Sequence, residues 1–232
     1  MMKFYGIQKL SLVDYDDEVS CTLFMRGCNM RCPFCHNFEL VVFNDAFSKA
    51  LNEDELKEFL KSHVGKLSAV VITGGEPTLD PELKDMCIYL KDLGYKVKLD
   101  SNGTNPDVII DLINNKLIDY VAIDIKNSIE GYNETIGKPS FDMDGIKRTV
   151  SYLISHNFPY EFRTTLIQDF HNIERIEAMG EWIRGAKKLF LQKFVVSDFV
   201  PDKTLNSVPT KNALEYRRIL ERYVDQVSLR GY

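Results

Sequence analysis

The most informative run of this sequence is Gly27-Cys28-Asn29-Met30-Arg31-Cys32-Pro33-Phe34-Cys35-His36-Asn37. Three of the five cysteines of the chain fall within it, in the spacing C-x3-C-x2-C. Because the run contains a proline and is flanked by glycine and asparagine, we expect a loop that turns the three sulfur atoms inward. Thiolates bind soft metals and iron–sulfur clusters. Three cysteine ligands would leave the fourth corner of a cubane cluster open for chemistry.

Two simpler interpretations of the three cysteines stay open. Structural zinc is usually closed by four protein ligands, and here the fourth would have to be His36, Cys21 or Cys87. His36 directly follows Cys35 and would have to reach around the same ion, whereas the two other cysteines are distant in the sequence. Both of these fall in apolar segments and are predicted to pack as small core residues. A disulfide with one unpaired thiol is the second alternative, and we favour cluster binding.

The cysteine motif resembles the signature of the radical S-adenosylmethionine (SAM) enzymes, C-x3-C-x-aromatic-C, with Phe34 as the aromatic residue. His36-Asn37 and the opening run Gly6-Ile7-Gln8-Lys9-Leu10-Ser11-Leu12-Val13-Asp14-Tyr15 resemble the branch that activates glycyl radical enzymes, in particular the activating proteins of anaerobic ribonucleoside-triphosphate reductase. The resemblance covers most of residues 5–200. It implies a [4Fe–4S] cluster, SAM as cofactor and reduced flavodoxin or ferredoxin as electron donor. Residues 38–51 contain no cysteine, which predicts a single cluster.

Composition and charge narrow the class of protein. A chain of 232 residues, 44% of them hydrophobic, fits one α/β domain, and the absence of linkers and repeats predicts a single domain over residues 1–232. No apolar run approaches the roughly 18 residues that a membrane span needs. The net charge of −5 gives no reason to expect a nucleic-acid partner. The N-terminus shows no signal-peptide pattern and three cysteines are clustered, so we expect a cytoplasmic protein.

Strand-like and helix-like segments alternate about six times, which predicts a parallel sheet with right-handed crossovers. Periodicity alone does not separate a flat sheet from a curved one. The family resemblance implies a partial (β/α)6 barrel, that is, a three-quarter TIM barrel with the cluster loop after its first strand. Strands are expected at 19–25, 67–73, 95–100, 119–126, 160–167 and 188–194, after a short strand within 3–8, and helices at 52–64, 81–93, 105–115, 144–156, 172–185 and 210–227. Residues 38–51 are expected to be irregular, and residues 127–141 are expected to form an extended loop.

Polar residues gather at the expected C-terminal ends of these strands, which face one ligand-binding crevice in parallel α/β folds. Two adjacent glycines allow backbone to approach a ligand closely, and their carbonyl groups, with a glutamate, can accept hydrogen bonds from an ammonium group. A glycine-rich turn before a helix is the alternative. The candidates that follow the cysteines are Gly74, Gly75, Glu76, Asp100, Ser101, Asn102, Asp124, Lys126, Arg163 and Gln192.

The resemblance implies roles for several of these candidates. Gly74-Gly75-Glu76 resembles the motif that holds the methionine amino group of SAM, and Asp100 resembles a further contact to that group. Lys126 is implied to bind the SAM carboxylate, with a salt bridge to Asp124 or Asp100 as the structural alternative. Asp100, Ser101 and Asp124 also resemble a monovalent-cation site.

The remaining candidates are placed around the nucleoside. Phe34 and His36 are implied to flank the adenine, partly through backbone groups. Arg163 could contact the carboxylate or ribose, or form a salt bridge within the barrel. Gln192 is assigned to the ribose side by its position alone.

These features together predict an oxidoreductase that reductively cleaves SAM to a 5′-deoxyadenosyl radical. Because the chain has almost nothing beyond the expected barrel, an open side suits a protein substrate, and the predicted hydrogen donor is a glycine of a glycyl radical enzyme. Anaerobic ribonucleotide reductase is the favoured partner, and pyruvate formate-lyase is an alternative. Two competing hypotheses are a small-molecule enzyme of the 7-carboxy-7-deazaguanine synthase type and a non-enzymatic metal or electron-transfer module. A basic group near the C-terminus is predicted to be a solvated helix face, with docking of a partner as the alternative: Lys211, Arg217, Arg218 and Arg222.

Overall fold

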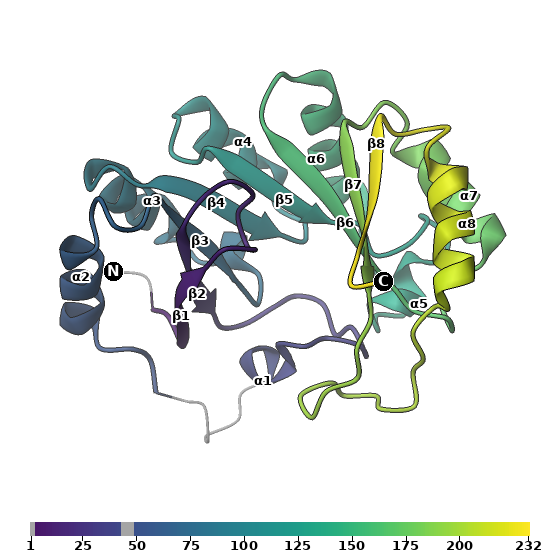
Figure 1. Cartoon of the computed structure of the whole chain (residues 1–232), viewed down its shortest axis with the longest axis horizontal. Helices are drawn as coiled ribbons and strands as arrows, with labels where there is room; N and C mark the ends of the chain where they lie inside the picture. The colour runs from purple at the N-terminus through teal and green to yellow at the C-terminus, as the bar shows by residue number, and fades with distance from the viewer. Residues whose placement is uncertain (1–2, 43–48) are drawn as a thin grey trace. The chain divides into compact units, whose positions relative to one another are not determined.

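The computed structural model describes residues 3–42 and 49–232, which form an α/β protein (Figure 1). The strands are β1 (Gly6–Ser11), β2 (Ser20–Met25), β3 (Ala69–Gly74), β4 (Lys96–Ser101), β5 (Tyr120–Asp124), β6 (Tyr160–Leu166), β7 (Lys188–Lys193) and β8 (Gln226–Arg230). The helices are α1 (Phe38–Val41), α2 (Glu53–Ser62), α3 (Leu83–Asp92), α4 (Pro106–Asn114), α5 (Tyr132–Thr135), α6 (Asp144–Ser155), α7 (Ile173–Trp182) and α8 (Thr210–Leu220), with a 3-10 turn η2 at Pro77–Leu79.

The strands take the order β1 to β8 through one mostly parallel sheet. β1 pairs antiparallel with β2, whereas β2 with β3, β3 with β4, β6 with β7 and β7 with β8 are parallel. The predicted α/β class is therefore confirmed. In the described part of the chain, no helix is both long enough and apolar enough to cross a membrane.

The chain divides into two compact units. Unit 1 comprises Met1–Asn29, Glu39–Ser101 and Asn105–Val121, and unit 2 comprises Met30–Phe38, Asn102–Thr104 and Ala122–Tyr232. The boundary divides the cysteine loop, because Cys28 belongs to unit 1 and the other two cysteines of the motif belong to unit 2. The candidate residues at the strand ends are likewise divided between the units.

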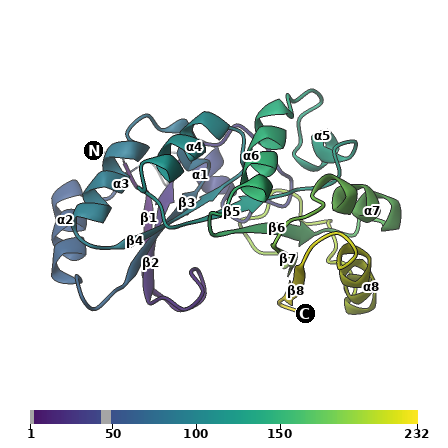
Figure 2. The same cartoon turned by 90° about the horizontal axis from the view of Figure 1, so that it is seen from above.

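The strand β3 of unit 1 is apolar on both faces. Val70, Val71 and Ile72 of β3 are fully buried, as expected for a parallel strand covered on both sides. α3 and α4 lie on the same side of β3 and β4 (Figure 2). α2 begins where predicted, because the side chain of Asn52 accepts hydrogen bonds from the backbone N–H groups of Asp54 and Glu55.

The two cysteines outside the motif are core residues of unit 1, as predicted. Cys21 on β2 and Cys87 on α3 are fully buried. Burial raises the pKa of each thiol to about 12, so both stay protonated near neutral pH. Neither is therefore suited to serve as a thiolate ligand.

Unit 2 carries its helices on one face of β6, β7 and β8. The hydroxyl of Thr164 on β6 lies 3.7 Å from the sulfur of Met179 on α7, so this face of the strand points to the helix layer. Alternate residues point to the other face. Glu161 and Arg163 of β6 belong to that second face, together with the residues beside them in register on β7 and β8. α7 packs against α8, as both views show (Figures 1 and 2).

Three predictions about the helices and strands are wrong. The helix expected over 210–227 ends at Leu220, and β8 follows it, because Gln226–Arg230 alternates polar and apolar residues with the period of a strand. Residues 127–141, expected to be a loop, contain α5. The segment 38–51, expected to be irregular, begins with α1, and its residues 43–48 lie outside the described ranges.

Candidate functional site

The cysteine loop is fixed by backbone hydrogen bonds in each unit. In unit 1, the N–H of Gly27 donates to the carbonyl of Leu40 (2.8 Å), and the carbonyl of Gly27 accepts from Glu76 N–H (2.7 Å). In unit 2, Arg31 N–H donates to the carbonyl of Ile136 (2.9 Å), and Asp202 N–H donates to that of Pro33 (3.0 Å). The loop therefore has a defined backbone on both sides of the unit boundary.

The three motif cysteines remain thiols. None of the five cysteines of the chain forms a disulfide, so the disulfide alternative is not supported. Cys32 is buried, and Cys28 and Cys35 are part-exposed. Burial raises the pKa of Cys35, and the nearby charge of Lys126 opposes this shift. Within residues 3–42 and 49–232, no three His, Cys, Asp or Glu side chains are grouped as ligands of a single metal ion.

Gly74 and Gly75 are required by a close approach of backbone to backbone. A Cβ on Gly74, whose φ is +115°, would lie 2.4 Å from the backbone nitrogen and oxygen of Met25. A Cβ on Gly75 would lie 1.9 Å from the carbonyl oxygen of Gly27. The two glycines thus let the end of β3 pack against the backbone just before Cys28. This contact was not predicted, because the glycine pair indicated only a close approach to a ligand.

Glu76 is the centre of a hydrogen-bond network in unit 1. Its side chain is 1% exposed, and its Oε1 accepts hydrogen bonds from the hydroxyl of Thr78 (2.5 Å), the backbone N–H of Thr78 (3.1 Å) and the hydroxyl of Ser101 (2.8 Å). The Asn105 amide donates to the hydroxyl and the carbonyl of Thr78. Glu76 therefore caps η2 and ties the end of β3 to the end of β4.

The two residues on either side of Ser101 differ in their contacts. Asp100 lies within β4 of unit 1, and its Oδ1 is 3.9 Å from the ammonium of the buried Lys98. Asn102 belongs to unit 2, where its side-chain oxygen accepts from the backbone N–H (3.1 Å) and the hydroxyl (2.7 Å) of Thr104. In this structure, Asn102 therefore stabilises a turn after β4.

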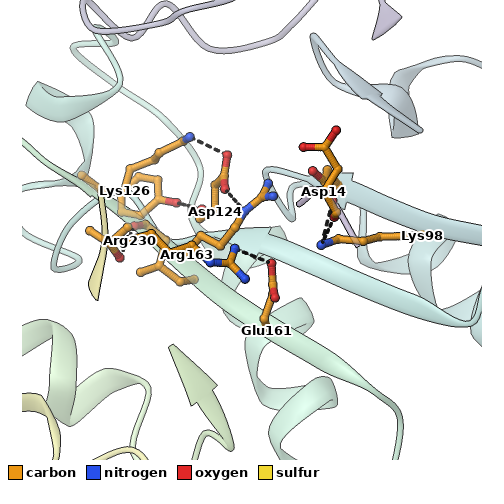
Figure 3. Close-up of polar contacts among 11 residues, drawn as sticks. Asp14, Lys98, Asp124, Lys126, Glu161, Arg163 and Arg230 are labelled. Atoms are coloured by element: carbon orange, nitrogen blue, oxygen red, sulfur yellow. Dashed lines mark hydrogen bonds and ion pairs between the residues drawn. The ribbon is translucent and has the colours of Figure 1, made fainter. Parts of the chain in front are cut away.

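Three charged residues meet at the end of β5 in unit 2 (Figure 3). Asp124 Oδ2 accepts from the Lys126 ammonium at 2.8 Å, and Asp124 Oδ1 accepts from Arg163 Nε at 2.9 Å. The side chains of Lys126, Asp124 and Arg163, here called the β5 triad, are 15%, 30% and 14% exposed. One carboxylate and two cations leave the triad with one net positive charge. A part-exposed group of this charge is suited to bind a carboxylate.

The pKa values of Asp124 and Lys126 keep both groups ionised near neutral pH. Burial favours the neutral form of Asp124, but the charges of Arg163 and Lys126 outweigh it and lower the pKa of Asp124 to about 2. Burial also favours the neutral form of Lys126, yet the carboxylate of Asp124 raises its pKa above the ordinary lysine value. The alternative of a salt bridge from Lys126 to Asp124 is therefore present in this structure.

The aromatic residues of the cysteine loop lie within unit 2. The Phe34 ring is buried, its centre lies 5.9 Å from the Lys126 ammonium, and it is tilted against the ring of Phe170 at 6.2 Å. The Nε2 of His36 is 2.8 Å from the carbonyl of Val195, and its ring lies 5.7 Å from that of Phe194. The segment after β7 therefore holds the end of the cysteine loop.

Gln192 of β7 lies in register between Thr165 of β6 and Arg230 of β8. Arg230, which was not among the predicted site residues, stacks over the Phe190 ring at 3.4 Å and lies 3.5 Å from the buried carboxylate of Glu161 (Figure 3). Arg230 was missed because its strand was not predicted. Once β8 is known, the alternation along Gln226–Arg230 places this arginine on the face that carries Gln192.

Comparison with known proteins identifies the family. A sequence profile described as the radical SAM superfamily matches residues 22–183. This chain belongs to the radical SAM superfamily. As a radical SAM enzyme it is an iron–sulfur oxidoreductase that uses SAM. The matched range includes the three cysteines, Gly74-Gly75-Glu76 and the β5 triad, but not Gln192.

Three other proteins are similar in sequence to this radical SAM chain. A protein of Methanocaldococcus jannaschii named "putative glycyl-radical enzyme activating enzyme" is 34% identical over 97% of this chain and 94% of its own length. The pyruvate formate-lyase-activating enzyme of Clostridium pasteurianum is 27% identical over 82% of this chain and 81% of its own length. The 7-carboxy-7-deazaguanine synthase of Aquifex aeolicus is 39% identical over 34% of each chain.

A solved structure shares the fold. It is a domain of the pyruvate-formate lyase-activating enzyme of Bacteroides vulgatus, which matches 71% of this chain and 99% of its own length with a TM-score of 0.56 and 19% identity. The expected fold class, a partial barrel of the radical SAM type, is therefore confirmed. The structure differs from the expectation in that its described residues form a sheet of eight strands.

The residues present fit the two cofactors that the family uses. Three cysteine thiols in one short loop are the donor set that an iron–sulfur cluster requires. The net positive charge of the β5 triad suits the carboxylate of an amino acid, and the carboxylates of Glu76 and Asp100 suit an ammonium. The β5 triad lies at strand ends within unit 2, and Glu76 and Asp100 lie at strand ends within unit 1.

Proposed function

We propose that the two units form a single radical SAM domain, in which Cys28, Cys32 and Cys35 together hold one [4Fe–4S] cluster. The family profile supports this proposal, because its matched range 22–183 runs from unit 1 into unit 2. The backbone bonds at Gly27 and at Arg31 would then hold the two sides of the cluster loop.

The proposed SAM contacts follow from the charges in each unit. Lys126, with Arg163, binds the carboxylate, for which the β5 triad has one net positive charge. Glu76 and Asp100 accept from the amino group, with the backbone of Gly74 and Gly75 beside them. The remaining proposed contacts are those of Phe34 and His36 with the adenine, Gln192 with the ribose, and Ser101 and Asn102 at the end of β4.

When bound, the reduced cluster and SAM together supply a 5′-deoxyadenosyl radical. The residues of the chain position this chemistry. Binding the amino group and the carboxylate, which are both on the α-carbon of SAM, fixes the end of the amino-acid part from which the sulfonium extends.

The proposed reaction is the removal of a hydrogen atom from a glycine of a glycyl radical enzyme, with anaerobic ribonucleotide reductase as the first choice of partner. One observation carries this proposal: the likeness to the "putative glycyl-radical enzyme activating enzyme" extends over nearly the whole of both chains. The likeness to the pyruvate formate-lyase-activating enzyme supports pyruvate formate-lyase as the alternative partner.

An exposed apolar segment supports a protein substrate. Val195, Val196 and Phe199 are exposed, and they lie on the segment whose backbone carbonyl at Val195 contacts His36 of the cysteine loop. A macromolecule that reaches this loop would cover them. We expect Phe199→Asp, at a residue 51% exposed, to lower the glycyl radical yield about tenfold and to leave partner-independent SAM cleavage unchanged. Leu214→Asp on α8, also exposed, is the control, and an equal loss in both variants would contradict the expectation.

The decisive experiment uses anaerobically reconstituted protein with reduced flavodoxin, SAM and each candidate partner in turn. We expect a glycyl doublet by electron paramagnetic resonance on ribonucleotide reductase, together with methionine and 5′-deoxyadenosine. A doublet on pyruvate formate-lyase alone would show that this enzyme, and not ribonucleotide reductase, is the partner. SAM cleavage with no radical on either enzyme would overturn the proposed reaction. Replacing flavodoxin by ferredoxin tests the second electron donor.

A small-molecule reaction is the second candidate function, favoured by the local 39% identity to the 7-carboxy-7-deazaguanine synthase. Formation of a purine-like product from a pterin substrate would decide for it.

The predicted monovalent cation beside Asp100, Ser101 and Asp124 has its own test. Both oxygens of Asp124 accept from cationic side chains, so a bound ion would have to share this carboxylate. A SAM affinity that rises with potassium but not with tetramethylammonium would support the ion.

A further inference from the structure

His171 is a buried histidine that bridges two backbone segments of unit 2. It follows β6 in the turn before α7, and it is 3% exposed. Its Nδ1 lies 3.0 Å from both the backbone nitrogen and the carbonyl oxygen of Ile167, and its Nε2 lies 3.0 Å from the carbonyl oxygen of Lys126. The ring thus joins its own turn to Lys126 of the β5 triad.

The protonation state of His171 fits this bridge. With the proton on Nε2, the ring donates to the carbonyl of Lys126 and accepts the N–H of Ile167, whereas a proton on Nδ1 would donate to the carbonyl of Ile167 and leave Nε2 facing a carbonyl oxygen without a proton. Burial lowers the pKa of His171 to about 4, so the ring is neutral near pH 7. The neutral ring therefore has one donor and one acceptor, and both have backbone partners.

The turn that carries His171 also contacts the other residues around Lys126. The side-chain amide of Asn127 donates to the carbonyl of Phe170 at 3.0 Å, and the Phe170 ring packs against Phe34. The hydroxyl of Tyr216 on α8 donates to the carbonyl of His171 at 3.0 Å. The turn is therefore anchored to α8 on one side and to the end of β5 on the other.

We infer that His171 is a positioning residue that fixes the backbone at Lys126, so that the Lys126 ammonium is presented to the carboxylate of SAM. This inference rests on the proposed role of Lys126. A side chain of similar shape without polar atoms would leave the Lys126 carbonyl and the Ile167 N–H without their bonds to the ring. The backbone at the end of β5 would then be less constrained, and the ammonium would occupy a wider range of positions.

The test compares two ligands that differ only in the group that Lys126 is proposed to bind. Dissociation constants of SAM and of decarboxylated SAM are measured by equilibrium binding to anaerobically reconstituted protein. In the His171→Phe variant, we expect affinity for SAM to fall about tenfold and affinity for decarboxylated SAM to change less than about twofold. His171→Gln, which keeps an N–H donor and an oxygen acceptor, should recover part of the preference for SAM.

Three controls separate positioning from folding. Iron content and thermal unfolding report whether each variant keeps its fold, and if His171→Phe does not fold, His171→Gln is compared with the wild type alone. His156→Gln, at the exposed histidine that follows the last residue of α6, should leave both affinities unchanged. Equal weakening of both ligands, or an unchanged preference for SAM in the folded His171 variants, overturns the inference.

The Lys126→Met variant distinguishes this inference from the proposed site. If Lys126→Met loses the preference for SAM while the His171 variants keep it, the positioning role alone is overturned. If Lys126→Met keeps the full preference, the assignment of Lys126 is wrong, and the positioning role is overturned with it. Neither result depends on the glycyl radical partner, because only ligand binding is measured.

Discussion

The end of β3 in unit 1 and the end of β5 in unit 2 each hold a carboxylate, but they hold it by different means. Glu76 is buried and receives hydrogen bonds from hydroxyl and backbone N–H groups, which are neutral donors. Asp124 is part-exposed and receives its hydrogen bonds from two cations. The first arrangement depends on shape and on the close backbone contact at Gly75, and the second depends on charge. Substitutions in unit 1 should therefore act through packing, and those in the β5 triad should depend on pH.

The largest effect is expected at Gly75. Gly75→Ala places a Cβ 1.9 Å from the carbonyl oxygen of Gly27, so the end of β3 must move away from the cysteine loop. We expect a loss of about 3–5 kcal/mol in the free energy of unfolding, measured in urea, and little bound iron after reconstitution. Gly6→Ala is the control, because Gly6, like Gly75, lacks a positive φ, and an added Cβ there would lie at an ordinary 3.5 Å from the Phe24 side chain. Equal losses in the two variants would remove the close contact as the cause.

The next effect is expected at Asp124 and should depend on pH. The pKa of Asp124 is lowered from the ordinary value of 3.8 to about 2, so its ion pairs stabilise the folded chain above the ordinary pKa. This stability is lost as the pH falls from about 4 toward 2. Asp124→Asn should cost about 2 kcal/mol at pH 7, and the difference from the wild type should narrow below pH 4.

Urea unfolding at several pH values measures this difference, with Asp144→Asn in the exposed pair with Lys147 as the control. The control should show little change at any pH. If the cost of Asp124→Asn stayed constant down to the lowest pH at which the chain folds, charge would not be what holds the β5 triad.

The smallest effect is expected at Ser101. Ser101→Ala removes one hydrogen bond that a neutral hydroxyl donates to the Glu76 carboxylate, which should cost about 1.5 kcal/mol and should not vary between pH 5 and 8. Ser62→Ala, at an exposed serine of α2, is the matched control with less than about 0.5 kcal/mol. If the cost of Ser101→Ala changed strongly with pH, charge would control the stability of the end of β3 as well as that of the end of β5.

The basic group near the C-terminus gives a reference for charges outside the site. Arg217 pairs with Glu221 and Arg222 pairs with Glu177, and all four side chains are exposed. These two pairs agree with the predicted solvated face. Exposed pairs of this kind contribute little to stability, in contrast to the β5 triad.

The sequence predicts the elements that repeat and misses the contacts that join them. The strand ends at Glu76, Asp100 and Asp124 could be located because a buried strand followed by polar residues is a local pattern. The contact of Gly75 with Gly27 joins residues far apart in the sequence, so no local pattern reports it. His171 lacked a signal for the same reason, since a single histidine in a turn does not reveal that its partner is a carbonyl group 45 positions earlier. β8 was missed because a short strand after a helix is easily taken for the last turns of that helix.

The burial of Cys21 and Cys87 has a practical consequence for measuring metal loading. Their thiols are fully covered and protonated, so a maleimide dye applied to the native protein should label neither of them quickly. Any labelling then comes from the loop that carries the other three sulfur atoms. Protection from the dye after reconstitution would thus measure the occupancy of the cluster directly, without iron analysis and without any partner enzyme.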